Sequence, residues 1–107
     1  MSDTLQRIQS LVQSKYVRIS EHGYDELSND GLIAQEAVEG VFGAVLIEDY
    51  PDYPKGVCIL VLQRDRQGNP IHTVWGIPKK HSKPAVLVTA YRPDPNLWDE
   101  KFMRRKK

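Results

Sequence analysis

The chain has one cysteine and no long apolar run, and these absences exclude several classes of protein. Cys58 alone cannot form a disulfide within the chain, which excludes a disulfide-stabilised secreted scaffold. Because Cys58 lies in the apolar run 57–62, we expect a buried thiol in a reducing compartment. No stretch approaches the roughly 20 apolar residues of a membrane span. The first residues also lack the basic and apolar regions of a signal peptide. We therefore expect a cytoplasmic protein that does not interact with membranes.

Residues that bind metals are also sparse. The three histidines, His22, His72 and His81, show no tight ligand spacing with each other or with the cysteine, which argues against a closed zinc site. The sequence has no glycine-rich phosphate loop and no serine or cysteine nucleophile motif. We expect neither a metal nor any other cofactor.

What is present suits a single small domain. The 107 residues are 40% hydrophobic and 27% charged, which is typical of a soluble globular protein. The net charge of +1 hides an asymmetry, because residues 1–50 carry a charge of −6 and residues 51–107 a charge of +7. This asymmetry favours an anionic partner for the basic half. Two solvated faces of opposite sign are the alternative explanation.

Local patterns predict an α+β fold with helices first and strands after them. Helical spacing or capping residues predict helices over 3–14, 20–29 and 33–42, and extended patterns predict strands over 16–19 (an edge strand), 45–48, 57–62, 71–77 and 85–91. Asp94 and Pro95 predict a last helix, with Trp98 and Phe102 on its inner face. We expect N-terminal helices packed on a twisted, mostly antiparallel four-stranded sheet. Residues 1–15 would be a helical extension and residues 16–107 the domain.

Two histidines are candidates for proton transfer. His22 falls in the first turn of a predicted helix, with Asp25 and Glu26 on the same side to orient its ring. A surface histidine in an ordinary i,i+4 pair is the alternative. Strand alternation places His72 on one face with Gly76, where both could line a groove. A hydrogen-bonded histidine within the sheet explains His72 equally well.

Tyr91 and Arg92 end the last predicted strand, beside a loop where a site could be assembled. Arginine can hold a phosphate through two hydrogen bonds, and tyrosine can stack on a base. Alternatively, Arg92 pairs with Asp94 or Asp99 and Tyr91 covers the rim of the core. Four further basic residues are candidates for binding RNA phosphates, or are simply solvated: Arg64, Lys79, Lys80 and Arg104.

Four blocks of the sequence resemble the family named domain of unknown function 4258. They are residues 16–27 (YVRISEHGYDEL), 45–51 (VLIEDYP), 70–74 (PIHTV), and 89–94 (TAYRPD) continuing to Trp98. The resemblance covers about residues 16–104 and leaves the first helix outside it. That family is similar to a branch of the RelE/ParE-type toxins, which implies a RelE-like fold of helices on a twisted antiparallel sheet.

The resemblance implies a toxin of a bacterial toxin–antitoxin pair that cleaves RNA without a metal. The RNA 2′-hydroxyl would attack the adjacent phosphate, with His22 and His72 as the proton-transfer pair, either of which could be the base. Arg92 and Arg64 would hold the phosphate and Tyr91 would orient it or stack on a base. The expected partners are RNA, including mRNA on the ribosome, and a cognate antitoxin. The alternatives are a non-catalytic nucleic-acid- or protein-binding module on the same fold, and a small protein that keeps the fold for assembly alone.

Overall fold

The computed structural model describes residues 3–106, and none of its helices is long and apolar enough to cross a bilayer. The helical elements are α1 (Asp3–Gln13), α2 (Glu21–Asn29), α3 (Ala34–Glu39) and the 3-10 helix η1 (Gly40–Gly43). The strands are β1 (Val17–Ile19), β2 (Val45–Tyr50), β3 (Cys58–Arg64), β4 (Pro70–Gly76) and β5 (Ala85–Tyr91). The α+β class and the three N-terminal helices are confirmed.

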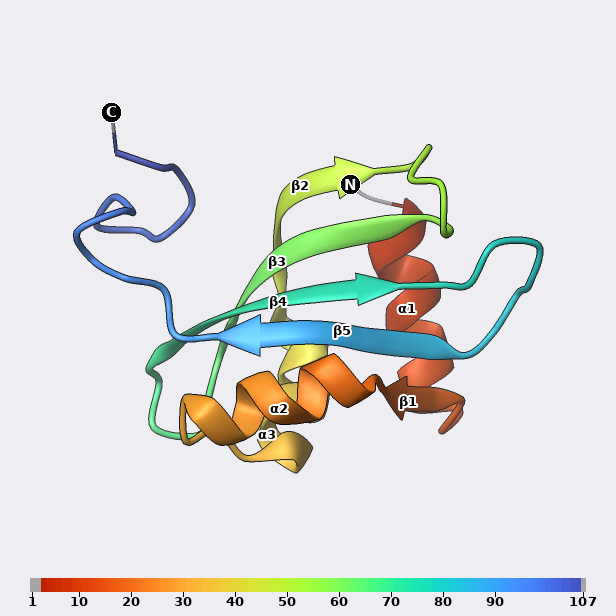
Figure 1. Cartoon of the computed structure of the whole chain (residues 1–107), viewed down its shortest axis with the longest axis horizontal. Helices are drawn as coiled ribbons and strands as arrows, with labels where there is room; N and C mark the ends of the chain where they lie inside the picture. Colours follow the sequence, from red (N-terminus) through yellow and green to blue (C-terminus); the bar gives the residue numbers. More distant parts are fainter. Residues whose placement is uncertain (1–2, 107) are drawn as a thin grey trace.

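The five strands form one sheet in the order β1-β5-β4-β3-β2 (Figure 1). From β2 to β5 the chain makes an antiparallel meander, in which each strand pairs with the next. β1 joins the far edge parallel to β5, with Val17 opposite Ala85. The mostly antiparallel arrangement and the edge strand at 16–19 are confirmed. The count of four strands is wrong, because the edge strand is a fifth member of the same sheet.

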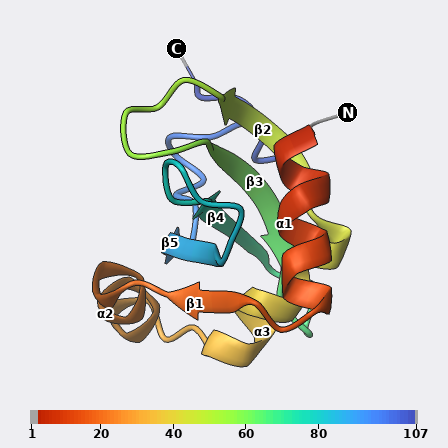
Figure 2. The ribbon, with the colours of Figure 1, turned by 90° about the vertical axis from the view of Figure 1, so that its right-hand side faces the viewer.

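The core lies between the helices and one face of the sheet. Ile8 of α1 and Leu27 of α2 are almost fully buried there, together with Ile59 and Trp75 of the sheet. Figure 2 shows α1 along one side of the sheet and the loop between β2 and β3 projecting on the other. Because side chains alternate along a strand, the residues between these core positions face away from the helices. We call this second side of the sheet the open face.

A buried amide joins α3 to the sheet. The Nε2 of Gln63 donates to the carbonyl oxygen of Ala37 at 2.7 Å. Its Oε1 accepts from the Oγ1 of Thr73 at 2.7 Å and from the Nε1 of Trp75 at 2.8 Å. Since every polar atom of this side chain has a partner, its burial carries little penalty.

α2 lies directly against the edge of β5 (Figure 1). Ser20 caps the helix as predicted, because its Oγ accepts from the N–H of Gly23 at 2.9 Å and also donates to the carbonyl oxygen of Val88 at 2.9 Å. A Cβ at Gly23 would lie 2.8 Å from the carbonyl oxygen of Leu87. Glycine is therefore what allows the first turn of α2 to approach the strand this closely.

The prediction of a last helix is wrong. Residues 93–106 form a series of turns and contain no helix or strand. The carboxylate of Asp94 accepts from the N–H of Asn96, and that of Asp99 accepts from the N–H of Met103. These short-range bonds close turns in place of a helical ladder. Phe102 has a positive φ of 58°, which breaks any helical run at this point.

Candidate nucleic-acid interface

The open face has a hollow of about 510 Å³ at the end of the sheet from which the β2–β3 and β4–β5 loops emerge. Its floor consists of small and apolar residues: Cys58, Val74, Gly76, Val86 and Val88. Its rim carries two cations and two phenols: Arg18, Lys55, Tyr50 and Tyr53. An apolar floor beneath a cationic and aromatic rim suits a ligand with a flat apolar part and a negative charge.

A close backbone contact forms one wall of the hollow. Gly56, in the β2–β3 loop, has a φ of 126°, and a Cβ there would lie 2.1 Å from the carbonyl oxygen of Ile77. On either side of it, the N–H of Ile77 donates to Val57 and the N–H of Lys79 donates to Lys55, both at 3.0 Å. Only glycine permits this approach, so Gly56 holds the two loops together.

A second hollow of about 420 Å³ lies across this wall and shares Tyr53 and Gly56 with the first. Its lining includes three cations and a histidine: Arg7 from α1, and Lys79, Lys80 and His81 from the β4–β5 loop. The acidic residue in its lining is Asp52. The predicted phosphate-binding residues Lys79 and Lys80 therefore lie together, next to the hollow on the open face.

The cations around the two hollows have no carboxylate partners among residues 3–106. Within residues 3–106, ion pairs join His22 to Glu26, Arg66 to Glu39 and Arg92 to Asp65. We call the unpaired cations around the hollows the basic end of the sheet: Arg7, Arg18, Lys55, Lys79 and Lys80. Nearby, the ammonium of Lys83 lies 4.1 Å above the ring of Tyr16. Unpaired cations bind an anion without first breaking an internal ion pair.

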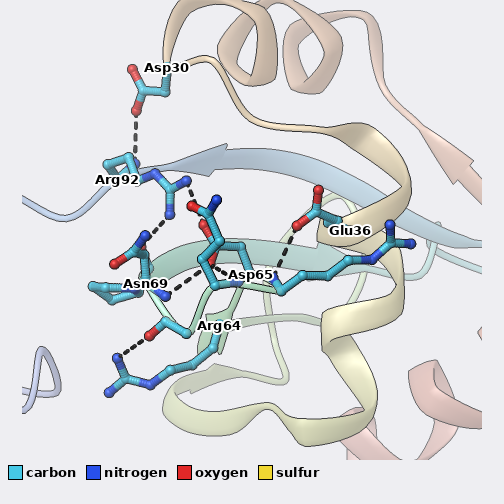
Figure 3. Close-up of polar contacts among 10 residues, drawn as sticks. Asp30, Glu36, Arg64, Asp65, Asn69 and Arg92 are labelled. Atoms are coloured by element: carbon cyan, nitrogen blue, oxygen red, sulfur yellow. Dashed lines mark hydrogen bonds and ion pairs between the residues drawn. The ribbon is translucent and has the colours of Figure 1, made fainter.

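The opposite end of the sheet carries arginines that are already engaged (Figure 3). The guanidinium of Arg92 donates to the carboxylate of Asp65 at 2.7 Å and to the carbonyl oxygen of Pro70 at 3.2 Å. The N–H of Arg92 donates to the carboxylate of Asp30 at 2.8 Å. Arg64 donates to the carbonyl oxygen of Gly68 within the β3–β4 hairpin at 3.1 Å.

These contacts change the interpretation of two predicted site residues. Arg92 does form an internal ion pair, but with Asp65 rather than with Asp94 or Asp99. β4 is seven residues long, so its two ends are about 20 Å apart. Arg64 and Arg92 are at one end and Lys79 follows the other. The predicted phosphate-binding residues therefore do not form one group.

These contacts lower the pKa of the Asp65 carboxyl group. Burial by itself would raise its pKa, but hydrogen bonds from Arg92 and from the backbone N–H groups of Asn69 and Gln67 outweigh it and lower the pKa. The side chain of Asp65 is 8% exposed, whereas that of Arg92 is 38% exposed. The pair thus joins the hairpin to the end of β5 as an ionised, structural contact.

The two histidines predicted to transfer protons are not brought together. His22 lies on the surface of α2, with its side chain 65% exposed and its Nε2 3.8 Å from the carboxylate of Glu26. This is the i,i+4 surface pair that was the alternative reading. His72 is on the open face, where residues 93–106 make it fully buried.

His72 has a partner for each ring nitrogen. Its Nε2 lies 2.7 Å from the carbonyl oxygen of Phe102, which can only accept, so Nε2 carries the proton. Its Nδ1 then accepts from the hydroxyl of Tyr91 at 3.3 Å. Burial lowers the pKa of His72 and raises that of Tyr91, so both groups are neutral near pH 7. The ring of Trp98 meets His72 edge-on, with the ring centroids 4.3 Å apart.

Arg104 lies apart from the basic end, in the C-terminal segment, where its N–H approaches the carboxylate of Asp99 at 3.4 Å. Tyr50, on the rim of the hollow, donates its hydroxyl to Glu48, which raises the pKa of Tyr50 to about 12. Tyr50 is therefore a neutral phenol at the rim.

Sequence reasoning missed Arg18, Lys55, Tyr50 and Tyr53 as site residues. For Arg18 a signal existed, because it alternates with Val17 and Ile19, which pack against the core. Alternation therefore places Arg18 on the opposite side. Tyr53 and Lys55 lie in a turn-rich loop, whose direction no local pattern reveals.

Within residues 3–106, no three histidine, cysteine, aspartate or glutamate side chains gather where they could hold a metal ion.

Comparison with known proteins identifies the family. Residues 19–92 match the family described as "Domain of unknown function (DUF4258)". The chain belongs to this family. The matched region runs from the end of β1 to Arg92, so it includes the floor of the hollow and the His72–Tyr91 pair but not α1 or residues 93–106. The resemblance predicted for residues 16–104 is thus confirmed over most of its length. No curated protein and no solved structure showed significant similarity to the chain.

Proposed function

We propose that this DUF4258 protein binds single-stranded RNA across the open face of its sheet. The observation that carries the proposal is the hollow itself, which joins an apolar floor to Arg18, Lys55, Tyr50 and Tyr53. Proteins that bind single strands combine cations that follow the backbone with aromatic rings on which bases stack. The preference for RNA rests on the resemblance to the RelE/ParE-type toxins.

The distribution of free charge supports this surface over the hairpin end and the α2–α3 surface. The basic end has cations without carboxylate partners, whereas Arg66 and Arg92 at the hairpin end have one each. No lysine or arginine occurs between Arg18 and Lys55, so α2 and α3 carry only acidic charges. An RNA strand would therefore be attracted to the basic end and repelled from the α2–α3 surface.

The test is binding of a labelled oligouridylate of about 12 nucleotides, a length within the usual site sizes of such proteins. The wild-type chain should bind it with an affinity that falls steeply with salt. The Arg18→Ala/Lys55→Ala variant should bind more weakly, and its salt slope should be smaller by about 1.4, because each lost phosphate contact removes about 0.7.

The matched control is Arg64→Ala/Arg66→Ala, which removes the same charge from two exposed residues at the hairpin end. Its affinity and slope should equal those of the wild type. Equal losses in both double variants would mean that binding depends on net charge alone, and the proposed surface would be wrong.

A second candidate function is cleavage of the bound RNA by a toxin of a toxin–antitoxin pair. The observation that favours it is the contact of His72 with Tyr91 on the same face as the hollow. In this second proposal, His72 and Tyr91 act on the RNA and His22 does not. A cognate antitoxin covers the basic end. Cleavage should persist with chelator present, be lost in Tyr91→Phe and be kept in His22→Ala. Binding without cleavage would leave the RNA-binding module as the function.

A further inference from the structure

Residues 93–106 form a compact unit with its own backbone hydrogen bonds, which packs on His72 of the sheet. Their backbone hydrogen bonds are internal: Leu97 and Trp98 donate to Asp94, Asp99 donates to Arg104, and Lys106 donates to Leu97. The carboxylates of Asp94 and Asp99 also accept from N–H groups within the segment. The guanidinium of Arg105 lies 5.2 Å from the ring of Trp98. We call this unit the C-terminal segment.

His72 of the sheet receives both a hydrogen bond and a ring contact from this segment. Among the hydrogen bonds of residues 3–106, the one that joins the C-terminal segment to the rest of the chain runs from the Nε2 of His72 to Phe102. The ring contact that joins them is that of Trp98 with His72. Trp98 is only 5% exposed there, so its ring is inserted against the sheet.

The ring of Trp98 occupies a place with the properties of a base-binding site. The rings of His72 and Trp98 meet in a T-shaped arrangement with 4.3 Å between their centroids, and the ring of Tyr91 stands 5.4 Å from that of His72. Arg105 lies 5.2 Å from the indole ring but belongs to the C-terminal segment, so the site itself consists of His72 and Tyr91. Proteins bind unpaired bases by stacking them on aromatic or histidine rings, and His72 and Tyr91 supply such rings once Trp98 has left.

This site continues the hollow on the open face. His72, Val74 and Gly76 alternate along β4 and point to the same side, and Val74 and Gly76 form part of the floor. The Cα of Val74 lies about 7 Å from that of His72, since each residue of a strand spans about 3.3 Å. A strand of RNA lying across the hollow would thus reach the Trp98 ring first as it passed toward the hairpin end.

We propose that His72 and Tyr91 form a nucleobase site, which Trp98 fills in the free protein and an unpaired base of RNA fills in the complex. This inference rests on the proposed function, because it assigns one subsite of the RNA surface. The C-terminal segment would leave as a unit, because its own hydrogen bonds do not depend on the sheet.

The experiment measures the affinity of Trp98→Ala for the same labelled oligouridylate. In the wild type Trp98 must leave before a base can enter, so removing its ring should tighten binding by the free energy of that ring's insertion, at least about 1 kcal/mol or about five-fold. The matched control is Leu97→Ala, because Leu97 is the neighbouring residue but is 61% exposed. Its affinity should equal that of the wild type.

A second measurement uses the wild-type chain and does not depend on how the variant folds. The protein has two tryptophans, so the indole N–H region of its NMR spectrum should contain two signals. Oligouridylate should shift the Trp98 signal and leave that of Trp75, which is fully buried in the core, in place.

The outcomes separate the two proposals. Wild-type binding with an unmoved Trp98 signal, or with no gain in Trp98→Ala, would overturn the nucleobase site and leave the RNA surface standing. If neither the wild type nor Trp98→Ala binds the oligonucleotide at low salt, the proposed function is wrong, and the nucleobase site is wrong as well.

Discussion

The guanidinium of Arg92 lies 2.7 Å from the carboxylate of Asp65, a residue 27 positions earlier in the chain. This contact joins the end of β5 to the β3–β4 hairpin, and Arg92 also reaches Pro70 and Asp30 (Figure 3). An arginine that pattern alone marks as a phosphate ligand is therefore used to hold the hairpin. It follows that Arg92 should matter for stability more than for binding.

Replacing Arg92 tests this role. Arg92→Ala removes two side-chain hydrogen bonds and leaves Asp65, only 8% exposed, without its counter-charge. We expect the free energy of unfolding to fall by about 1 to 2 kcal/mol, because the exposure of Arg92 itself weakens the pair. Urea unfolding measures this. The control Arg64→Ala, which loses one bond to a backbone oxygen, should change stability by about 0.5 kcal/mol or less. Equal effects of the two variants would contradict the structural role of Arg92.

The same ion pair should make stability depend on acid pH. The pKa of Asp65 is lowered in the folded protein, so its carboxylate favours folding at any pH above its unfolded value of about 3.9. That contribution should be lost as the pH falls through the folded pKa. Asp65→Asn should therefore be less stable than the wild type at pH 6, and the difference should shrink toward pH 2. A constant difference would show that the charge of Asp65 is not responsible.

His72 should give a second pH dependence, in a higher range. Burial lowers its pKa in the folded protein, while the unfolded chain takes up its proton near pH 6.5. Between these values the unfolded state binds more protons, so stability should fall as the pH drops below about 6.5. Plotted against pH, the free energies of unfolding of the wild type and of His72→Gln should run parallel above pH 7 and converge below it. Curves that stay parallel down to pH 5 would contradict the burial of a neutral His72.

Two glycines allow the wall of the hollow to be tested against a matched control. Gly56 and Gly68 both have positive φ, but a Cβ at Gly56 would meet the backbone of Ile77, whereas at Gly68 nothing lies within 4 Å. Gly68→Ala should lower the free energy of unfolding by about 1 kcal/mol, because of its backbone conformation alone. Gly56→Ala should cost at least about 2 kcal/mol and also weaken RNA binding, because the two loops must separate. Normal RNA binding by Gly56→Ala would show that the wall is not part of the interface.

Most of the secondary structure was predictable because its causes are local. Leu5, Ile8 and Val12 recur at helical spacing, and they pack on the core from α1 as that spacing predicts. The run around Ile59 is apolar on both sides, and β3 is an interior strand. The last helix was mispredicted because Asp94 and Asp99 can cap a helix or close a turn with equal ease. Whether this segment forms a helix or turns depends on where the Trp98 ring is buried.

The candidate site was less predictable, because its parts meet only through pairing of distant strands. Lys55 and Lys79 are neighbours because Gly56 lets two loops touch, and Arg18 joins them because β1 pairs with β5. His22 and His72 looked alike in sequence, yet one is 65% exposed on a helix and the other is fully buried.

The amino-acid sequence alone determined the class of the fold, the order of its elements and the separation of an acidic half from a basic half, since periodicity and composition are properties of neighbouring residues. Only the tertiary structure decided which charges are free. Arg92 forms an ion pair with Asp65, while Arg18, Lys55 and Lys79 have no ion-pair partner within residues 3–106 and lie around one end of the sheet. An ion pair forms or does not form according to distances between residues far apart in the chain, and folding sets those distances.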